Sequence, residues 1–460
     1  MSLIIPANTL ASGGFAVDNS CRFDTNAGMN KTAANGTRTK ATFSTWVKRS
    51  NITSESILFY SRIDASNHFL IRFTGSEQLE MVNRVSASNI SFYTTNALYR
   101  DPSSWYHIVW SLDSTQGTAG NRIKLFVNGT QVTSFATSTT QSADTNFVAN
   151  VNTAEYYVAQ EYTSGYNYFN GYLAETVWID GLALAADQFG EFDEDSGIWK
   201  PIDVSGLTFG ASGFYLDYED SSNLGNDANG GTDLTENNLA AIDQSTDTCT
   251  NNFCTMNPLY PDGTITFSEG NLKLTEGNSW RSAGGTMAVS TGKWFWEVSN
   301  VGNYAYIGFA DIQLFNEGCS IRESFTTGAA TTGRAHSVGN SDGRHYQVTS
   351  GGAQSSEYPG SPSLTAFTNS IIGVALNLDD NNFTLYKDGT AMNSGTPLSI
   401  TAGTYIPAVS IYGNNVSYNF GSPPYSESGG ETDGNGYGNF ANAVPSGYFA
   451  LCTKNLAEYG

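Results

Sequence analysis

The stretch GVALNLDDNNFTLYKDGTAM, residues 373–392, contains the pattern that decides the fold. It is an apolar run, a polar turn, a second apolar run, and an Asp-Gly turn followed by Thr. The first half of the chain repeats this order in WYHIVWSLDSTQGTAGNRIKLFVNGTQV, residues 105–132, where the closing turn is Asn-Gly. Both residues of a type I′ turn need a positive φ, which Asn, Asp and Gly adopt most easily. The chain therefore predicts a long antiparallel strand pair ending in a tight hairpin, at two places.

Strand patterns continue on both sides of these two stretches. In the first half, residues 41–50, 56–64, 68–75, 155–160 and 171–184 are strand-length runs rich in β-branched and aromatic residues. In the second half, Trp294, Trp296 and Val298 alternate with Phe295 and Glu297, as the two faces of one strand would. Only LAADQFGEF, residues 184–192, predicts a helix, of about two turns.

The composition favours a β-rich chain with more than one domain. The chain has 460 residues, of which 39% are hydrophobic, 13% aromatic and only 14% charged, with 48 glycines. This length exceeds one ordinary core. We predict an all-β protein of two tandem antiparallel sandwiches: a first domain over residues 1–220, a Gly/Asn-rich connector over 221–262, a second domain over 263–425, and a tail over 426–460 that packs back on the body.

The charge and the cysteines restrict the partners and the compartment. The net charge is −22, so nucleic acid and anionic membranes should be repelled, and no apolar run is long enough to span a bilayer. The N-terminal sequence lacks the pattern of a signal peptide. The five cysteines are scattered, so unpaired thiols are expected even for the neighbours Cys249 and Cys254, which favours assembly in a reducing cytoplasm.

Specific sequence segments in the two halves resemble two known families. The first half resembles the laminin-G-like, concanavalin A-like sandwiches, through SSWYHIVWSLDS, RIKLFVNGTQV and FNGYLAETVWIDGLAL over roughly residues 41–201. The second half resembles a SPRY domain, through GKWFWEV, YIGFAD, GVALNLDDNNFTLYKDG and GTYIPAVSIY, ending in VSYNFG, over roughly 263–425. These resemblances imply that both sandwiches are of the jelly-roll type.

Other segments resemble virion proteins of tailed bacteriophages, which combine these two domains in this order. They are IIPANTLASGGFAVDNSCRF near the N-terminus, DQSTDTCTNNFCTMNPL at the joint and GYFALCTKNL near the C-terminus. The resemblance implies a non-enzymatic protein on the virion surface, assembled in the bacterial cytoplasm. Its partners would be other virion proteins, further copies of itself and a host cell-surface glycan. It would be a tail-fibre or appendage adhesin; the alternative is a capsid decoration protein with protein contacts only.

An enzyme of another class is the second alternative, because the concanavalin-like fold also occurs in glycoside hydrolases. Such enzymes place two carboxylates on either side of one glycosidic bond. The segment GEFDEDSG offers Glu191, Asp193 and Asp195 at alternate positions, although the lack of β-formers favours a solvated loop. The two histidines His336 and His345 fall in a Gly/Ser-rich stretch read as a loop. No catalytic residue is therefore assigned, and a polysaccharide depolymerase is kept as an alternative.

Candidate binding residues are few. Sugar recognition needs aromatic faces beside hydrogen-bonding groups, and the candidates for it are Tyr162, Tyr166, Tyr304 and Tyr346. The stretch YEDSSNLGNDANGGTD offers oxygen ligands for Ca²⁺, with Asp220, Asn223 and Asp227 as candidates and Asn229 and Asp233 nearby. Its spacing is not that of an EF-hand loop, and turns closed by Asx hydrogen bonds explain it as well, so no cofactor is assigned.

Overall fold

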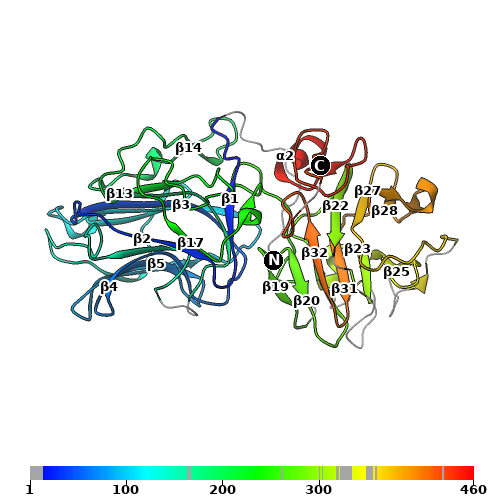
Figure 1. Cartoon of the computed structure of the whole chain (residues 1–460), viewed down its shortest axis with the longest axis horizontal. Coiled ribbons are helices and arrows are strands. Elements are labelled where there is room, and N and C mark those ends of the chain that lie inside the picture. The colour runs from blue at the N-terminus through cyan, green and yellow to red at the C-terminus, as the bar shows by residue number, and fades with distance from the viewer. Residues whose placement is uncertain are drawn as a thin grey trace. The chain divides into compact units, whose positions relative to one another are not determined.

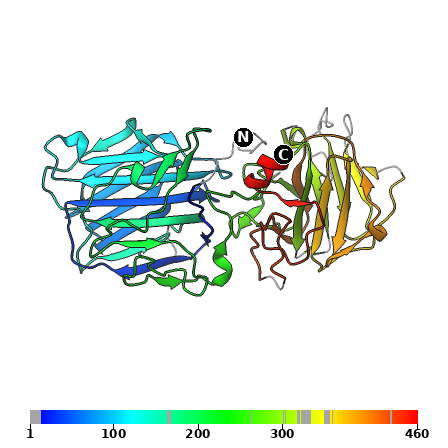
Figure 2. The ribbon, with the colours of Figure 1, turned by 90° about the horizontal axis from the view of Figure 1, so that it is seen from above.

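The protein divides into two compact units on either side of the bond between Thr250 and Asn251 (Figure 1, Figure 2). The computed structural model describes residues 14–162, 167–260, 263–299, 301–302, 304–316, 321, 334–348, 356–357, 360–426 and 429–460. Over these residues, the two α-helices are α1 (Ile312–Asn316) and α2 (Thr453–Tyr459). None of the described helices has the length and apolarity needed to cross a membrane. Strands dominate both units, so the prediction of an all-β protein is confirmed.

The first unit is a sandwich of two antiparallel sheets. One, the β3 sheet, has the order β10-β9-β8-β3-β13-β1-β18, with β16 beside β13; the other, the β5 sheet, has the order β11-β7-β6-β5-β4-β12-β2-β17. Figure 1 shows β3 and β13 in one layer and β4 and β5 in the other. The bounds are β1 (Ser20–Phe23), β2 (Gly28–Thr32), β3 (Lys40–Arg49), β4 (Ser56–Asp64), β5 (Asn67–Phe73), β6 (Gln78–Val85), β7 (Ser88–Leu98), β8 (Trp105–Asp113), β9 (Ile123–Val127), β10 (Thr130–Val132), β11 (Phe135–Thr139), β12 (Glu155–Val158), β13 (Gly171–Asp180), β16 (Phe214–Leu216), β17 (Thr235–Asn237) and β18 (Gln244–Ser245).

The second unit is also a sandwich. Its β22 sheet has the order β19-β20-β32-β22-β27-β28-β29, with β30 beside β28 and β33 beside β22, and its β23 sheet has the order β21-β31-β23-β24-β25-β26. The bounds are β19 (Thr266–Ser268), β20 (Lys273–Thr275), β21 (Arg281–Gly284), β22 (Lys293–Ser299), β23 (Ala305–Ala310), β24 (Ala335–Gly339), β25 (His345–Val348), β26 (Ser356–Glu357), β27 (Ile372–Asn377), β28 (Asn382–Lys387), β29 (Thr390–Ala391), β30 (Leu398–Ser399), β31 (Ile406–Ile411), β32 (Asn415–Asn419) and β33 (Phe449–Ala450).

The two predicted hairpins are confirmed. Strand β8 pairs with β9, and β9 returns as β10 through Asn128 and Gly129, whose φ values are 47° and 75°. Strand β27 pairs with β28, and β28 returns as β29 through Asp388 and Gly389, with φ values of 48° and 78°. Both turns therefore have the type I′ signature of positive φ at both central residues.

Two expectations about local structure differ from what is observed. The two-turn helix over residues 184–192 is wrong: a single 3₁₀ turn, Ala186–Gln188, is followed by β14 (Gly190–Phe192), which pairs with β15 (Trp199–Pro201). The pairing of β14 with β15 outweighs the weak local helix preference here. The boundary after residue 220 also differs, because the segment 221–250, expected as a connector, belongs to the first unit.

That segment is held by strand pairing and by a buried ion pair. Its strands β17 and β18 pair with β2 and β1. The Lys48 ammonium lies 2.6 Å from a carboxylate oxygen of Asp247, and both side chains are 1% exposed. The indole N–H of Trp105 donates a hydrogen bond to the other oxygen of Asp247. Burying two charges is costly unless they pair in this way, so Asp247 fixes the end of the first unit on β3.

The C-terminal tail covers the outer face of β22. Trp294, Trp296 and Val298 lie in the core of the sandwich, while Phe295 and Glu297 point to the opposite face and are equally buried. The tail supplies the cover: β33 pairs with β22, and the Glu297 carboxylate accepts four hydrogen bonds, from the backbone N–H groups of Ala441 and Asn442 and from the amides of Asn419 and Asn442. One buried carboxylate thus joins the tail to the centre of the sheet.

We expect Glu297→Ala to lower the free energy of unfolding by about 3 kcal/mol, because it leaves several buried donors without an acceptor. Urea unfolding of the full chain, followed by circular dichroism, measures the change. Glu431→Ala removes an exposed carboxylate of the same tail and should change stability by no more than about 0.5 kcal/mol. Equal effects of the two variants would contradict the role assigned to Glu297.

Candidate functional site

An aromatic pocket lies at one end of the β23 sheet. It has a volume of about 370 Å³ and is lined by Trp280, Tyr304, Ala305, Tyr306, Asn340, Ser341 and Tyr412. The antiparallel register brings these residues together: Ile411 at the end of β31 lies opposite Arg281 at the start of β21 and opposite Ala305 at the start of β23. The aromatic residue beyond each of these three positions therefore reaches the same end of the sheet.

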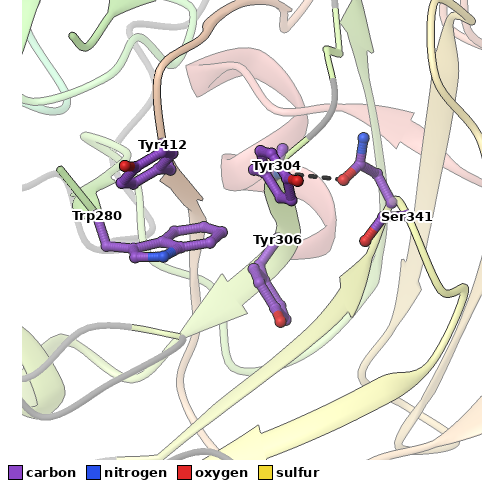
Figure 3. Close-up of a pocket in the computed structure, with 7 residues that line it drawn as sticks. Trp280, Tyr304, Tyr306, Ser341 and Tyr412 are labelled. Carbon is purple, nitrogen blue, oxygen red and sulfur yellow. Dashed lines mark hydrogen bonds between the residues drawn. The ribbon is translucent and has the colours of Figure 1, made fainter. Parts of the chain in front are cut away.

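The four rings surround one space (Figure 3). The Trp280 ring centroid lies 5.4 Å from that of Tyr306 in an edge-to-face arrangement, and 5.6 Å from that of Tyr412. The Tyr304 and Tyr412 centroids are 6.1 Å apart. These spacings are typical of aromatic pairs that stabilise one another, so the rings form a fixed wall.

The polar side of the pocket is built on Asn340. Its side chain is buried, and its Oδ1 accepts a hydrogen bond of 2.9 Å from the backbone N–H of Ala305 (Figure 3). Its own backbone N–H donates to the carbonyl of Ala305, and its carbonyl accepts from the N–H of Phe367. Asn340 thus continues the pairing of β23 beyond the end of β24. This fixes the position of Ser341, which is exposed at the mouth of the pocket.

The chemistry of this lining is that of a binding site for a ring with hydroxyl groups. Tyr304 and Tyr412 are 55% and 36% exposed, and their hydroxyls make no hydrogen bond to the rest of the described chain. The lining contains aromatic faces, three phenol groups, an amide and a hydroxyl, but no carboxylate, imidazole or thiol among its described members. It can stack on a ring and exchange hydrogen bonds.

The four predicted tyrosines have different positions. Tyr304 lines the pocket. Tyr346 adjoins it through Tyr306, with ring centroids 5.2 Å apart, and its hydroxyl donates a 2.5 Å hydrogen bond to Asp342, so it supports the wall from behind. Burial and the nearby Asp342 carboxylate raise the pKa of Tyr346. Tyr162 is exposed in the first unit, and Tyr166 lies outside the described residues.

Sequence reasoning missed Trp280, Tyr306 and Tyr412. Trp280 stands alone in EGNSWRSAGG, before a short strand, and Tyr412 closes AVSIY, which reads as an ordinary strand end. The available signal was that an aromatic residue flanks the end of each of three short strands. The register that brings those ends together cannot be read from one sequence.

His336 and His345 lie on paired strands, β24 and β25, and the expectation that they fall in a loop is wrong. The N–H of Thr401 donates to Nε2 of His336, so the proton of His336 is on Nδ1 and is donated to Nε2 of His345, 3.2 Å away. Nδ1 of His345 then donates to the Ser361 hydroxyl. Burial lowers the pKa of His336 to about 3 and that of His345 to about 4. The pair is neutral and structural.

The carboxylates considered for hydrolysis do not form an acid–base pair. Asp193 accepts hydrogen bonds from the N–H and the hydroxyl of Ser196, and it lies 3.2 Å from the Lys200 ammonium. The Ser196 backbone and hydroxyl groups, together with Lys200, lower the pKa of Asp193 to about 2. Glu191 is exposed and also lies near Lys200. A general acid needs a raised pKa, so the arrangement favours a turn closed by Asp193.

The residues considered for calcium do not converge on a cation. Oδ1 of Asp220 is occupied by the N–H and the hydroxyl of Ser222, and the amide of Asn223 donates to Asp233. Asp227 accepts from the N–H of Tyr215 and faces the Lys31 ammonium at 3.6 Å. Over the described part of the chain, no three His, Cys, Asp or Glu side chains are grouped as metal ligands would be. These residues form Asx turns and do not fit a Ca²⁺ site.

The described cysteines are not joined in disulfides. Cys21, Cys249, Cys254 and Cys452 form no disulfide, and all but Cys249 are buried, whereas Cys319 lies outside the described residues. The expectation that Cys249 and Cys254 are not bonded to one another is therefore confirmed.

A comparison with known families supports the expected type of the first domain. Residues 23–188 match the model of the family described as the concanavalin A-like lectin/glucanases superfamily, which confirms the resemblance of the first half. No curated protein matches the chain.

Similar solved structures include the SPRY domain of human HERC1, at 16% identity and a TM-score of 0.27, covering 35% of this chain and 96% of that one. A protein of Bacteroides ovatus described as a candidate carbohydrate-binding protein has 14% identity and a TM-score of 0.35, covering 48% of this chain and 58% of that one. Domains LG4-5 of the mouse laminin α1 chain have 9% identity and a TM-score of 0.31, with 90% of each chain covered. With TM-scores below 0.5, these structures carry no functional argument.

We expect the histidine pair to make stability fall in mild acid. An unfolded histidine binds a proton with a pKa near 6.5, whereas the pKa is about 3 for folded His336 and about 4 for folded His345. The contribution of the neutral pair to the free energy of unfolding is therefore complete above pH 6.5 and is lost as the pH falls toward 4. Between pH 7 and pH 5 the loss is about 2 kcal/mol per histidine. Urea unfolding at the two pH values should show a smaller loss in His345→Gln; an unchanged pH dependence would contradict this account.

Proposed function

We propose that the protein is a non-enzymatic glycan-binding protein whose binding site is the aromatic pocket of the second unit. The observation that carries the proposal is the set of four converging rings at the end of the β23 sheet, two of them exposed and with hydroxyls available to a ligand. Aromatic faces stack on the apolar face of a sugar ring, while the phenol groups and Ser341 supply the hydrogen-bonding groups that give orientation.

The biological setting we propose is the surface of a tailed bacteriophage, where the chain acts as a tail-fibre or appendage component that contacts host cell-surface glycans. The support for this setting is the resemblance of residues 4–23, 243–259 and 447–456 to such virion proteins. A surface with few charged residues, a net negative charge and many Asn, Ser and Thr residues suits contacts that are polar and hydrated. In this setting other virion proteins and further copies of the chain are its partners.

The proposed binding needs no metal. The calcium candidates are occupied by turn hydrogen bonds and by Lys31, and the pocket contains no carboxylate among its described lining residues. Binding to a glycan should therefore be the same with and without EDTA, and no reducing ends should be released from the bound polysaccharide. Release of reducing ends that is lost in Glu191→Gln would support a depolymerase instead.

The test is binding of the purified, labelled full chain to host cells and to their isolated polysaccharide. We expect Tyr304→Ala and Trp280→Ala to weaken binding about tenfold each, because a buried aromatic contact contributes about 1–2 kcal/mol. Phe192→Ala, which removes another exposed aromatic ring (51% exposed) from the first unit, is the matched control and should bind as the wild type does.

The outcomes separate the adhesin from its alternative. Binding that competes with phage adsorption and is lost in the two pocket variants supports the proposal. A chain that binds neither cells nor polysaccharide, but is retained on purified capsids, would replace it with a capsid decoration protein.

A further inference from the structure

Two of the aromatic rings of the pocket lie on segments that cross between the two sheets of the second unit. Residues 276–280 connect β20 of the β22 sheet to β21 of the β23 sheet, and Trp280 is the last of them. Residues 412–414 connect β31 of the β23 sheet to β32 of the β22 sheet, and Tyr412 is the first of them. We refer to them as the two crossover segments. Because β20 pairs with β32 and β21 pairs with β31, the crossover segments run side by side.

The side chain of Glu276 joins the two crossover segments. It is buried, with only 8% of its surface exposed. Both of its carboxylate oxygens accept from the backbone N–H of Ser279, the residue before Trp280, at 2.9 and 3.1 Å. Its Oε2 also accepts a 3.0 Å hydrogen bond from the N–H of Gly413, the residue after Tyr412. One carboxylate therefore binds the backbone directly beside both rings.

The backbones of the two crossover segments also lie close together. The N–H of Glu276 donates to the carbonyl of Asn414 at 2.9 Å, and the N–H of Asn414 donates to the carbonyl of Glu276 at 3.0 Å. This exchange extends the pairing of β20 with β32 by one residue. Gly413 has a φ of 56°, and a Cβ at this position would lie only 3.1 Å from the carbonyl oxygen of Gly277. The absence of a side chain thus allows the close approach that the carboxylate needs to reach both segments.

These contacts set the separation of two walls of the pocket. The ring centroids of Trp280 and Tyr412 are 5.6 Å apart, and Figure 3 shows the two rings next to one another. The N–H of Tyr412 donates to the carbonyl of Tyr304, 3.1 Å away, so the second crossover segment is also joined to the opposite wall. A binding site keeps its affinity only while its contact groups stay within about 0.5 Å of the productive geometry. A movement of one crossover segment would therefore change the fit of a ligand.

We propose that Glu276 is the positioning residue of the aromatic pocket, which holds Trp280 and Tyr412 at the separation that a sugar ring needs. The inference rests on the proposed function for the nature of the ligand. Glu276 is not among the residues that line the pocket, so it acts through the two rings.

The chemistry of the contact requires a carboxylate. Both oxygens of a carboxylate accept hydrogen bonds, whereas a glutamine has one oxygen and one NH₂ group, which is a donor. In Glu276→Gln the NH₂ group would face a backbone N–H of Ser279 or Gly413, and a buried donor without an acceptor is unfavourable. The crossover segments should then move apart.

The test compares Glu276→Gln with two matched variants of the full chain. Glu297→Gln alters another buried carboxylate that accepts backbone N–H bonds, but on the outer face of the β22 sheet, so it controls for lost stability. Glu431→Gln removes an exposed carboxylate of the second unit and controls for charge. One readout is the affinity for isolated host polysaccharide. The other, measured without polysaccharide, is the rate at which N-bromosuccinimide oxidises Trp280, determined by mass spectrometry.

We expect Glu276→Gln to bind the polysaccharide about tenfold more weakly and to have Trp280 oxidised several-fold faster, because the ring is no longer held in place. Both control variants should stay within about twofold of the wild type in both readouts. Glu276→Asp keeps the charge but is too short to reach both crossover segments, so it should resemble Glu276→Gln. If circular dichroism shows that Glu276→Gln does not fold, Glu276→Asp decides the proposal.

Weaker binding and faster Trp280 oxidation that are confined to the Glu276 variants support the proposal. An unchanged rate of Trp280 oxidation in these variants overturns it. Equal loss of affinity in Glu297→Gln also overturns it, because the effect would then come from stability alone. If the wild type binds no polysaccharide, the proposed function fails, while the rate of Trp280 oxidation still decides whether Glu276 positions the ring.

Discussion

The register of β31 between its two neighbours is the constraint on which the candidate site depends. Ile411 lies opposite Arg281 on one side and Ala305 on the other, so the residues just beyond these positions, Trp280, Tyr304 and Tyr412, meet at one end of the sheet. A slip by one residue would turn every side chain of a strand to the opposite face. The buried core residues Ile307 and Val409 on these strands oppose such a slip, because it would expose them. Core packing in this way positions an exposed site.

Both units bury the two faces of their central strands, and polar side chains then hold the covering segments in place. On β22 the outward Glu297 binds the C-terminal tail through three hydrogen bonds, and on β3 the outward Lys48 binds Asp247. In both cases a buried charge is satisfied by a segment distant in sequence. The fold therefore depends on a few charged residues despite the low overall content of charge.

The sequence was informative wherever a local pattern determines the structure. The Asn128-Gly129 and Asp388-Gly389 turns, the alternation around Trp294 and the all-β class could be predicted, since each follows from the conformations of single residues or from the period of a strand. The segment that follows Ala186–Gln188 and the histidine strands were misjudged because strand pairing decides them: β14 pairs with β15, and β24 pairs with β23 and β25. Of the pocket, Tyr304 could be named, but Trp280 and Tyr412 could not, because their meeting depends on the register of three strands.

The central claim is that a glycan occupies the aromatic pocket. The most direct measurement is the rate at which N-bromosuccinimide oxidises each tryptophan, determined by mass spectrometry with and without host polysaccharide. Trp280 is partly exposed in the pocket, whereas Trp294 and Trp296 are buried in the core and serve as internal references. The account predicts that saturating polysaccharide slows the oxidation of Trp280 and leaves that of Trp199, in the first unit, unchanged. Oxidation of Trp280 at the same rate in the presence of bound polysaccharide would contradict it.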